Sequence, residues 1–271
     1  MSAKIIRIVG AGPAGLAAAI AVGRLGYRAY VDERRADVGL RFHGDFQGLE
    51  NWTTHEDVLA EIAALGVQPE FRHKAYREVV VFDPTGVARV YRSEQPLFYL
   101  VTRGNVSGSL DSALKRQAVA AGAELHFDSP AARLPEGGIV TEGPHRADAI
   151  AAGYLFETDM ADAAYAALSD ELAPKGYAYL LICNGRGTLA SCLFDDFHRE
   201  RDYVERCRAF FEEHTGVRLK NPRRFGGGGN FSLPRRAHKG AILYAGEAAG
   251  FQDPLFGFGM RWALLSGAAA G

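Results

Sequence analysis

Three glycines near the N-terminus have the spacing of a phosphate-binding turn. They follow an apolar run and open a segment made largely of alanine. In such a turn the first glycine permits a tight bend, the second lets the backbone approach a pyrophosphate, and the third lets a helix pack against a sheet. The phosphate binds the free N–H groups and the positive dipole end of that helix. The spacing therefore predicts a dinucleotide site formed by Gly10, Gly12, Pro13, Ala14 and Gly15.

An acidic residue after the second strand completes this pattern. The stretch RAYVDER carries Asp32 and Glu33 about 20 residues after Gly10, where a carboxylate accepts hydrogen bonds from an adenosine ribose. Side chains alternate between the two faces of a strand, and the register of residues 26–31 favours Glu33 over Asp32. We include Arg34, the next residue, in the predicted cofactor site.

The elements that position these residues follow from the apolar pattern. Residues 5–9 and 28–31 read as strands around a helix at 14–24, which is a βαβ unit. Thr54 is expected to cap a helix that stops at Gly66, and Ser109 a second helix that ends at Gly122. The remaining predicted elements are a meander of strands at 77–82, 87–92 and 98–102, a strand at 123–127, a hairpin at 177–183 and 188–194, a charged helix at 197–214, and a strand at 241–245 before a final apolar helix.

Composition excludes several classes of protein. The 271-residue chain has a formal net charge of -1, so no basic field favours nucleic acid or an anionic membrane. A transmembrane helix requires a run of about 18 apolar residues without charged ones, and the sequence contains no such run. Three cysteines are too few and too irregularly spaced for a disulfide framework, which favours a reducing compartment and a cytoplasmic location. Asp195, Asp196 and His198 read as the solvated start of a helix rather than as metal ligands, and no metal is predicted.

The far end of the chain resembles a second cofactor motif. The stretch ILYAGEAAGFQDPLFGFGMRWALLSG, residues 242–267, is similar to the second FAD motif of the para-hydroxybenzoate hydroxylase superfamily. In that resemblance the acid, here Glu247, lies by the ribityl chain and pyrophosphate, and the N-terminus of the following helix points at the isoalloxazine. The resemblance implies FAD as the cofactor, held also by Gly246, Gly257, Phe258, Gly259 and Met260.

Two further stretches resemble the geranylgeranyl reductase branch of that superfamily. They are GSLDSALKRQAVAAGAELHF and GYAYLLICNGRGTLA. The resemblance implies an α/β fold in which a Rossmann-like FAD-binding domain (1–75, 97–155 and 236–271) is interleaved with a β-sheet substrate domain (76–96 and 156–235). It also implies that Arg103 lies near the cofactor. The branch's A-D-G-x-x-S motif aligns with residues 151–156, where the acid and the serine are absent.

The resemblance implies reduction of C=C bonds in a small, apolar, isoprenoid-like and possibly lipid-like substrate, with NAD(P)H or ferredoxin as the electron donor. An aromatic and aliphatic wall is expected to contact that substrate, and His43 or Asp45 could donate the proton that accompanies a hydride. An ordered loop whose polar groups satisfy each other is the other interpretation of the His43–Asp45 stretch. A flavin monooxygenase of the same superfamily and a non-catalytic or electron-carrying flavoprotein are the alternative functions. The expected substrate wall consists of Tyr177, Tyr179, Leu181, Phe251 and Phe256.

Overall fold

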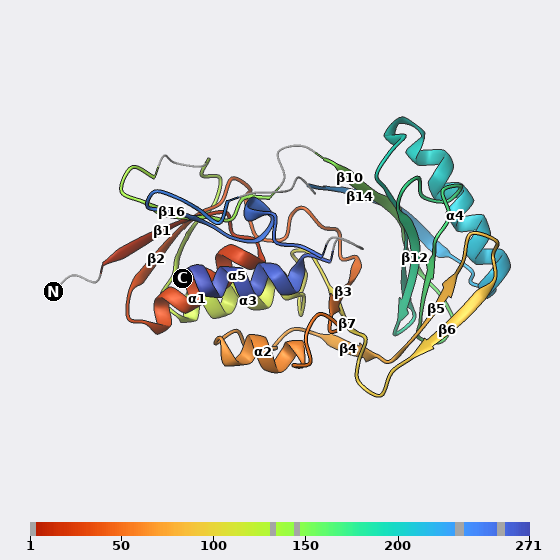
Figure 1. Cartoon of the computed structure of the whole chain (residues 1–271), viewed down its shortest axis with the longest axis horizontal. Coiled ribbons are helices and arrows are strands. Elements are labelled where there is room, and N and C mark those ends of the chain that lie inside the picture. Colours follow the sequence, from red (N-terminus) through yellow and green to blue (C-terminus); the bar gives the residue numbers. More distant parts are fainter. Residues whose placement is uncertain (1–3, 131–133, 144–146, 231–235, 254–257) are drawn as a thin grey trace.

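The computed structural model describes residues 4–130, 134–143, 147–230, 236–253 and 258–271. These residues form three sheets with helices packed on them, in an elongated molecule (Figure 1). The N-terminal sheet lies at one end and a larger, mainly antiparallel sheet lies at the other. The predicted fold class, a Rossmann-like domain interleaved with a β-sheet domain, is confirmed.

The N-terminal sheet is the six-stranded one, and its central strands are parallel. β1 pairs in parallel with β2 on one side and with β9 on the other, so the βαβ unit read from the sequence is present. The strand order is β15 (His238–Lys239), β16 (Ile242–Tyr244), β9 (Gly138–Val140), β1 (Ile5–Val9), β2 (Arg28–Asp32) and β8 (Glu124–His126).

Helices α1 (Pro13–Arg24), α3 (Leu110–Ala120) and α5 (Met260–Ala270) cover one face of this sheet (Figure 1). Small residues allow very close packing here. A Cβ at Gly267 of α5 would lie 2.1 Å from the carbonyl oxygen of Ala14 in α1, so only glycine permits this backbone contact. Ser109 caps α3 by accepting a hydrogen bond from the Ser112 amide, as predicted.

The second sheet has seven strands and carries helix α4 (Glu200–Thr215), which follows a 3-10 turn, η1 (Phe197–Arg199). A buried apolar cluster joins the sheet to α4. The strand order is β14 (Lys220–Gly229), β10 (Ala149–Glu157), β13 (Arg186–Leu193), β12 (Tyr177–Cys183), β11 (Ala163–Ala167), β5 (Glu78–Phe82) and β6 (Ala88–Arg92).

The hairpin predicted in this sheet is present as β12 and β13. Its turn is the pair Asn184-Gly185, both with positive φ, at 50° and 71°. A two-residue turn with positive φ at both positions is type I′, whose twist matches the right-handed twist of the two strands. Asparagine and glycine are the residues that adopt positive φ most readily, which explains the Asn-Gly pair.

A small third sheet lies between the other two. It consists of β3 (Phe46–Glu50), β7 (Phe98–Thr102) and β4 (His73–Tyr76), in that order. The predicted meander is wrong in its third strand, because β5 pairs with β6 while β7 joins this separate sheet. The connection of residues 93–97, which contains Pro96, has the same length as that of residues 83–87, but it carries the chain away from β6 and into the third sheet.

Two other sequence expectations differ from the structure. Helix α2 (Val58–Ala64) is capped by Asp57, whose carboxylate accepts hydrogen bonds from the Leu59 and Ala60 amides, so Thr54 is not the N-cap. The domain boundary expected at residue 155 falls inside β10, both of whose neighbours, β13 and β14, belong to the seven-stranded sheet. The chain therefore enters that sheet at Ala149.

A buried ion pair ties α5 to the segment before α2. The side chains of Arg261 and Glu50 are both fully buried, with Nη1 and Oε2 3.7 Å apart, and Arg261 also pairs with Glu61. Removing one member of such a pair leaves a buried charge without compensation.

We predict that Arg261→Met lowers the free energy of unfolding by about 3–5 kcal/mol. Equilibrium unfolding in urea measures this free energy. Arg28→Met, which removes an exposed pair with Glu124, is the control and should cost under about 1 kcal/mol. Adding Glu50→Gln to Arg261→Met should recover part of the loss, because it removes the unpaired charge. A loss as small as that of the control would contradict the prediction.

Candidate functional site

One continuous pocket of about 1140 Å³ runs from the N-terminal glycine turn to the seven-stranded sheet. It is lined at one end by residues 10–14 and 32–35, in the middle by residues of the 39–48 segment, and at the far end by β12, β11 and β5. The N-terminus of α5 also faces it, at Gly259 and Met260. Except for Gly15 and Gly246, the described site residues expected from the two ends of the sequence therefore line one cavity.

The glycine turn has the shape that the sequence requires. Gly10 has a φ of 98°, and its N–H donates to the carbonyl oxygen of Asp32 at 2.8 Å. A Cβ at Gly15 would lie 1.8 Å from the Gly10 oxygen, so the helix can approach the turn only with glycine there. A Cβ at Gly12 would meet no protein atom within 4 Å and would project into the pocket. Among the described residues no side chain caps α1, so its N-terminus presents backbone amides to the pocket.

The two acids at the end of β2 have different surroundings. Asp32 is buried, pairs with Arg7 at 2.9 Å, and accepts a hydrogen bond from Ser129 Oγ at 2.8 Å. Glu33 is only half-buried, and its carboxylate accepts hydrogen bonds from the Ala11 amide at 2.8 Å and the Arg35 amide at 3.0 Å. Glu33 is therefore held against the glycine turn, while Asp32 is engaged in structural contacts.

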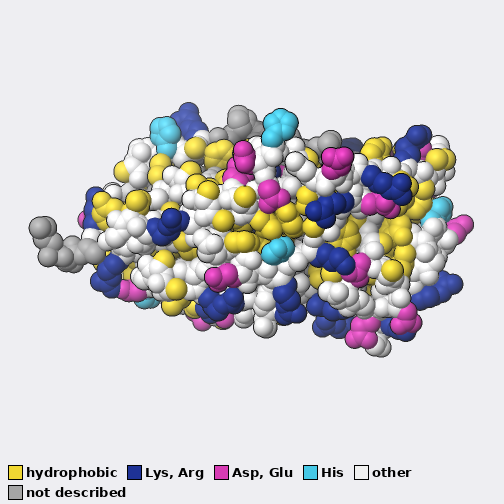
Figure 2. All heavy atoms as spheres, turned by 90° about the horizontal axis from the view of Figure 1, so that it is seen from below, with side chains coloured by type: hydrophobic (Ala, Val, Ile, Leu, Met, Phe, Trp, Pro, Cys, Tyr) yellow, Lys and Arg dark blue, Asp and Glu magenta, His cyan; other side chains and the backbone are white. Residues whose placement is uncertain are grey.

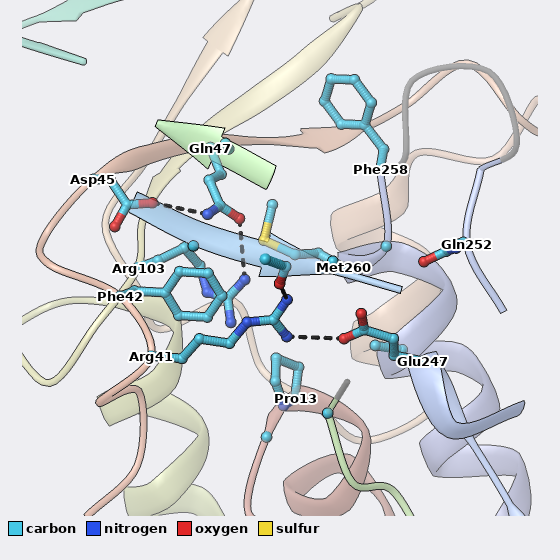
Figure 3. A pocket seen from close by; sticks show the side chains of 18 of the residues that line it. Pro13, Arg41, Phe42, Asp45, Gln47, Arg103, Glu247, Gln252, Phe258 and Met260 are labelled. Atoms are coloured by element: carbon cyan, nitrogen blue, oxygen red, sulfur yellow. Dashed lines mark hydrogen bonds and ion pairs between the residues drawn. The ribbon is translucent and has the colours of Figure 1, made fainter. Parts of the chain in front are cut away.

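The two arginines expected at the cofactor lie in contrasting places. Arg34 is exposed and lines the pocket. Arg103 is buried and donates two hydrogen bonds to Asp111, at 2.9 and 3.0 Å, and a third to Gln47 at 3.2 Å. Its guanidinium also lies over the Phe42 ring, 3.9 Å from the centroid (Figure 3). Arg103 thus lines the pocket while fixing the 42–47 segment to α3.

The C-terminal motif contributes Glu247 to the middle of the pocket. Glu247 lies in a 3-10 turn, η2 (Gly246–Ala249), and accepts hydrogen bonds from Arg41 Nη1 at 2.8 Å and the Asn230 amide at 2.7 Å. Arg41 reaches it across the space above Pro13 (Figure 3). Arg41 was not predicted as a site residue, and no motif marks it. Its place in the site depends on its contact with Glu247, which lies 206 residues further along the chain.

The other residues expected from this motif divide into three groups. Phe258, Gly259 and Met260 line the pocket. Gly246 packs beside it, with its N–H donating to Ser266 Oγ at 2.9 Å. Gly257 lies outside the described residues, as does Phe256 of the expected substrate wall.

The segment aligned with the A-D-G-x-x-S motif lies away from the glycine turn. Residues 151–156 belong to β10 in the seven-stranded sheet. The segment that lies against the turn is Thr141-Glu142-Gly143, which follows β9. Thr141 Oγ1 lies 2.9 Å from the carbonyl oxygen of Val9 and 2.8 Å from that of Gly10, so its hydroxyl group can donate a hydrogen bond to either. Glu142 and Gly143 line the pocket. An acid followed by glycine is therefore present at this edge, ten residues earlier than the sequence alignment placed it.

The two proton-donor candidates, His43 and Asp45, differ in exposure although both line the pocket. Asp45 is 1% exposed, and its carboxylate accepts hydrogen bonds from the His43 amide at 2.9 Å and Gln47 Nε2 at 2.8 Å. The His43 side chain is exposed, and its ring lies 6.5 Å from that of Phe225. A hydrogen-bonded chain, Asp45–Gln47–Arg103–Asp111, thus connects the pocket to α3. Figure 3 shows its first three members.

The expected substrate wall occupies one face of β12. Tyr177, Tyr179 and Leu181 line the pocket, whereas Leu180 is fully buried on the opposite face, as strand alternation predicts. Phe251 also lines the pocket, from the segment after η2.

The ionisable groups of this wall are neutral at physiological pH. Burial raises the pKa of Tyr177 and of Tyr179 well above 10. Cys192 stands directly opposite Tyr177 and hydrogen-bonds to it, and burial raises the pKa of its thiol to about 12. The wall therefore presents apolar surface and neutral hydroxyl and thiol groups.

Neither a metal cluster nor a membrane span is found in the described part of the chain. Asp195 and Asp196, which the sequence analysis assigned to a solvated helix start, form ion pairs with Lys175 and with His198. No described helix has the length and apolar character that crossing a bilayer requires.

Several solved structures with this fold are named as flavin-dependent enzymes or as similar to a reductase. A geranylgeranyl bacteriochlorophyll reductase-like protein from Thermoplasma acidophilum superposes with a TM-score of 0.75 and 19% identity, over 98% of this chain and 76% of that one. A probable FAD-dependent monooxygenase from Pseudomonas aeruginosa gives 0.65 and 16%, over 98% and 84%. The myxobacterial chondrochloren halogenase, which is FAD-dependent, gives 0.67 and 15%, over 97% and 73%. No protein-family model and no curated protein sequence matches the chain.

The raised pKa of Cys192 predicts a loss of stability in alkali. A thiol that ionises at about 12 when folded and near 9 when unfolded stabilises the fold below pH 9, and this stabilisation is lost as the pH rises from 9 towards 12. We expect the free energy of unfolding to fall between pH 7 and pH 11 by about 2–3 kcal/mol more in the wild type than in Cys192→Ser. Chemical unfolding at both pH values measures this difference. Equal losses in the two proteins would contradict the prediction, because they would show that the Cys192 thiol ionises at the same pH in the folded and the unfolded chain.

Proposed function

We propose that the pocket binds FAD. The observation that carries this proposal is the arrangement of Gly12, the uncapped N-terminus of α1 and Glu33 along one wall of a single elongated cavity. The absence of a Cβ at Gly12 and the exposed amides suit a pyrophosphate, and Glu33 suits the hydroxyl groups of an adenosine ribose.

The other end of the cavity fits the flavin half of the cofactor. The N-terminus of α5 faces the cavity at Gly259, with no capping side chain among the described residues, so a positive helix end is directed there. Glu247 and Arg41 lie between the two helix ends, where they would contact the ribityl chain and the phosphates. The fold shared with FAD-dependent enzymes supports the same assignment.

We propose further that the protein is an oxidoreductase that reduces C=C bonds of an apolar, isoprenoid-like substrate. Reduced flavin, when bound, would supply the hydride. The chain's own residues would orient an uncharged substrate, because the wall of Tyr177, Tyr179 and Leu181 offers no charge to a polar one. The phenol groups of Tyr177 and Tyr179 remain protonated and can hold a proton near the substrate.

A flavin monooxygenase is the second candidate, favoured by the likeness to the probable monooxygenase from Pseudomonas aeruginosa. Both candidates use the same cofactor site and differ in what reacts at the apolar wall. NAD(P)H and ferredoxin are both candidate electron donors.

The first test of the proposed function concerns the two acids after β2. We expect Glu33→Ala to weaken FAD binding by about ten- to a hundredfold, because a hydrogen bond to a charged group contributes roughly 1.5–3 kcal/mol. Asp32→Asn is the matched control. It should leave the FAD affinity within about threefold of the wild type while lowering stability, because Asp32 contacts Arg7 and Ser129 instead. Fluorescence titration of the apoprotein with FAD measures both. A larger effect of Asp32→Asn on affinity would contradict the assignment, as would a protein that takes up no FAD.

The second test separates reduction from oxygenation. Photoreduced holoprotein is mixed anaerobically with geranylgeraniol, and flavin absorbance and product mass are followed. Reoxidation with a product heavier by two hydrogens supports the reductase. We expect Tyr177→Phe to retain FAD and to slow this reaction at least about tenfold, because general acid–base catalysis typically accelerates a reaction by about a hundredfold or more. A product with one added oxygen, formed only in air, would replace the reductase assignment with a monooxygenase.

A further inference from the structure

A row of pocket-lining side chains crosses the seven-stranded sheet from its centre to its edge. Tyr179 of β12 pairs with Ala166 of β11, Ala166 pairs with Val81 of β5, and next to this row Val79 pairs with Tyr91 of the edge strand β6. Directly paired residues point to the same face of a sheet, and all five line the pocket. We call these five residues the trough.

The trough is apolar and open at its outer end. Ala166, its smallest side chain, lies between Tyr179 and Val81 and leaves a low point in the floor. Tyr91 of the edge strand β6 is 52% exposed. Leu168, which directly follows β11 and also lines the pocket, is 38% exposed. Viewed from below, hydrophobic side chains are gathered at the surface over this half of the molecule, among scattered charged groups (Figure 2).

The length of the trough follows from strand geometry. Neighbouring strands lie about 4.8 Å apart, so the three steps from β12 to β6 span roughly 14 Å. A compact ring would need only the wall at β12, whereas a chain that extends away from the reacting end would fill the whole row. The exposed Tyr91 marks the place where the chain would emerge.

We propose that the trough binds the hydrocarbon tail of the substrate and that Ala166 and Val81 determine how long a tail is accepted. The tail crosses β11 over Ala166, where only a small side chain leaves room, and then passes Val81 towards Tyr91. This inference rests on the proposed function in assigning the pocket to an apolar substrate, and it adds the path of the tail and the residues that select its length.

The test measures equilibrium binding of geraniol, farnesol and geranylgeraniol to the purified full chain by isothermal titration calorimetry. Each buried methylene group contributes about 0.8 kcal/mol at most, or about fourfold in Kd, so wild-type affinity should rise at least about tenfold with each added isoprene unit. Ala166→Leu should reduce geranylgeraniol affinity at least about tenfold and geraniol affinity less than about threefold. Val81→Phe should leave farnesol affinity nearer the wild-type value than Ala166→Leu does, because the added phenyl ring blocks the trough one strand further out.

Ala163→Leu is the matched control, since it adds the same side chain to the same strand on the opposite face. Ala163 pairs with Ile182, which is buried between the sheet and α4, and it does not line the pocket. This control should keep the wild-type length dependence. Equal affinity for the three alcohols, an equal loss for all three in Ala166→Leu, or no binding by protein that contains FAD would overturn the inference. Length-dependent binding by protein that takes up no FAD would support the trough and contradict the proposed function.

Discussion

The backbone contact between α1 and α5 is the constraint on which the candidate site depends. Gly267 approaches the Ala14 carbonyl so closely that no side chain fits between the helices, and Gly15 meets the Gly10 turn in the same way. These contacts set how closely α1 and α5 pack. The N-termini of both helices face one cavity, so two positive helix ends are directed into it.

The segment between the two helix ends is held by charge. Arg103 and Asp111 form a buried bidentate pair, and Gln47 extends it to Asp45. A charged group that is almost fully buried requires such partners, because desolvation without them is costly. Asp45 thus belongs to a network that orders the pocket wall, and the same network connects it to α3.

Much of the fold could be predicted from local sequence, because the signals were strong where geometry leaves few choices. The Gly10–Gly15 spacing and the Ser109 cap each require particular residue types, and each was recognised. The hairpin of β12 and β13 was predicted as well, with its second strand starting two residues late. β14 was missed because Gly226–Gly229 has no side chains and little intrinsic preference for a strand. Its ten residues are a strand because β10 supplies the pairing, which is information held elsewhere in the chain.

Local sequence also predicts where part of the candidate site lies, because side chains alternate between the two faces of a strand. Alternation along β2 separates Glu33 from Asp32, and alternation along β12 separates Leu180 from the pocket residues. Arg41 and Thr141-Glu142-Gly143 could not be found in this way. Both act through contacts with residues more than 100 positions away, so only the folded chain shows which residues they face.

The glycine-rich strand β14 also affects how the pocket can change. Gly226, Gly227 and Gly228 line it with backbone alone, so any substitution there adds atoms and none removes them. A Cβ at Gly228 would lie 2.9 Å from Ala147, whereas one at Gly227 would meet no protein atom within 4 Å. Substitution along this edge can therefore narrow the cavity but cannot widen it, and Gly226 and Gly227 are the positions where a Cβ would fit without displacing a neighbouring atom.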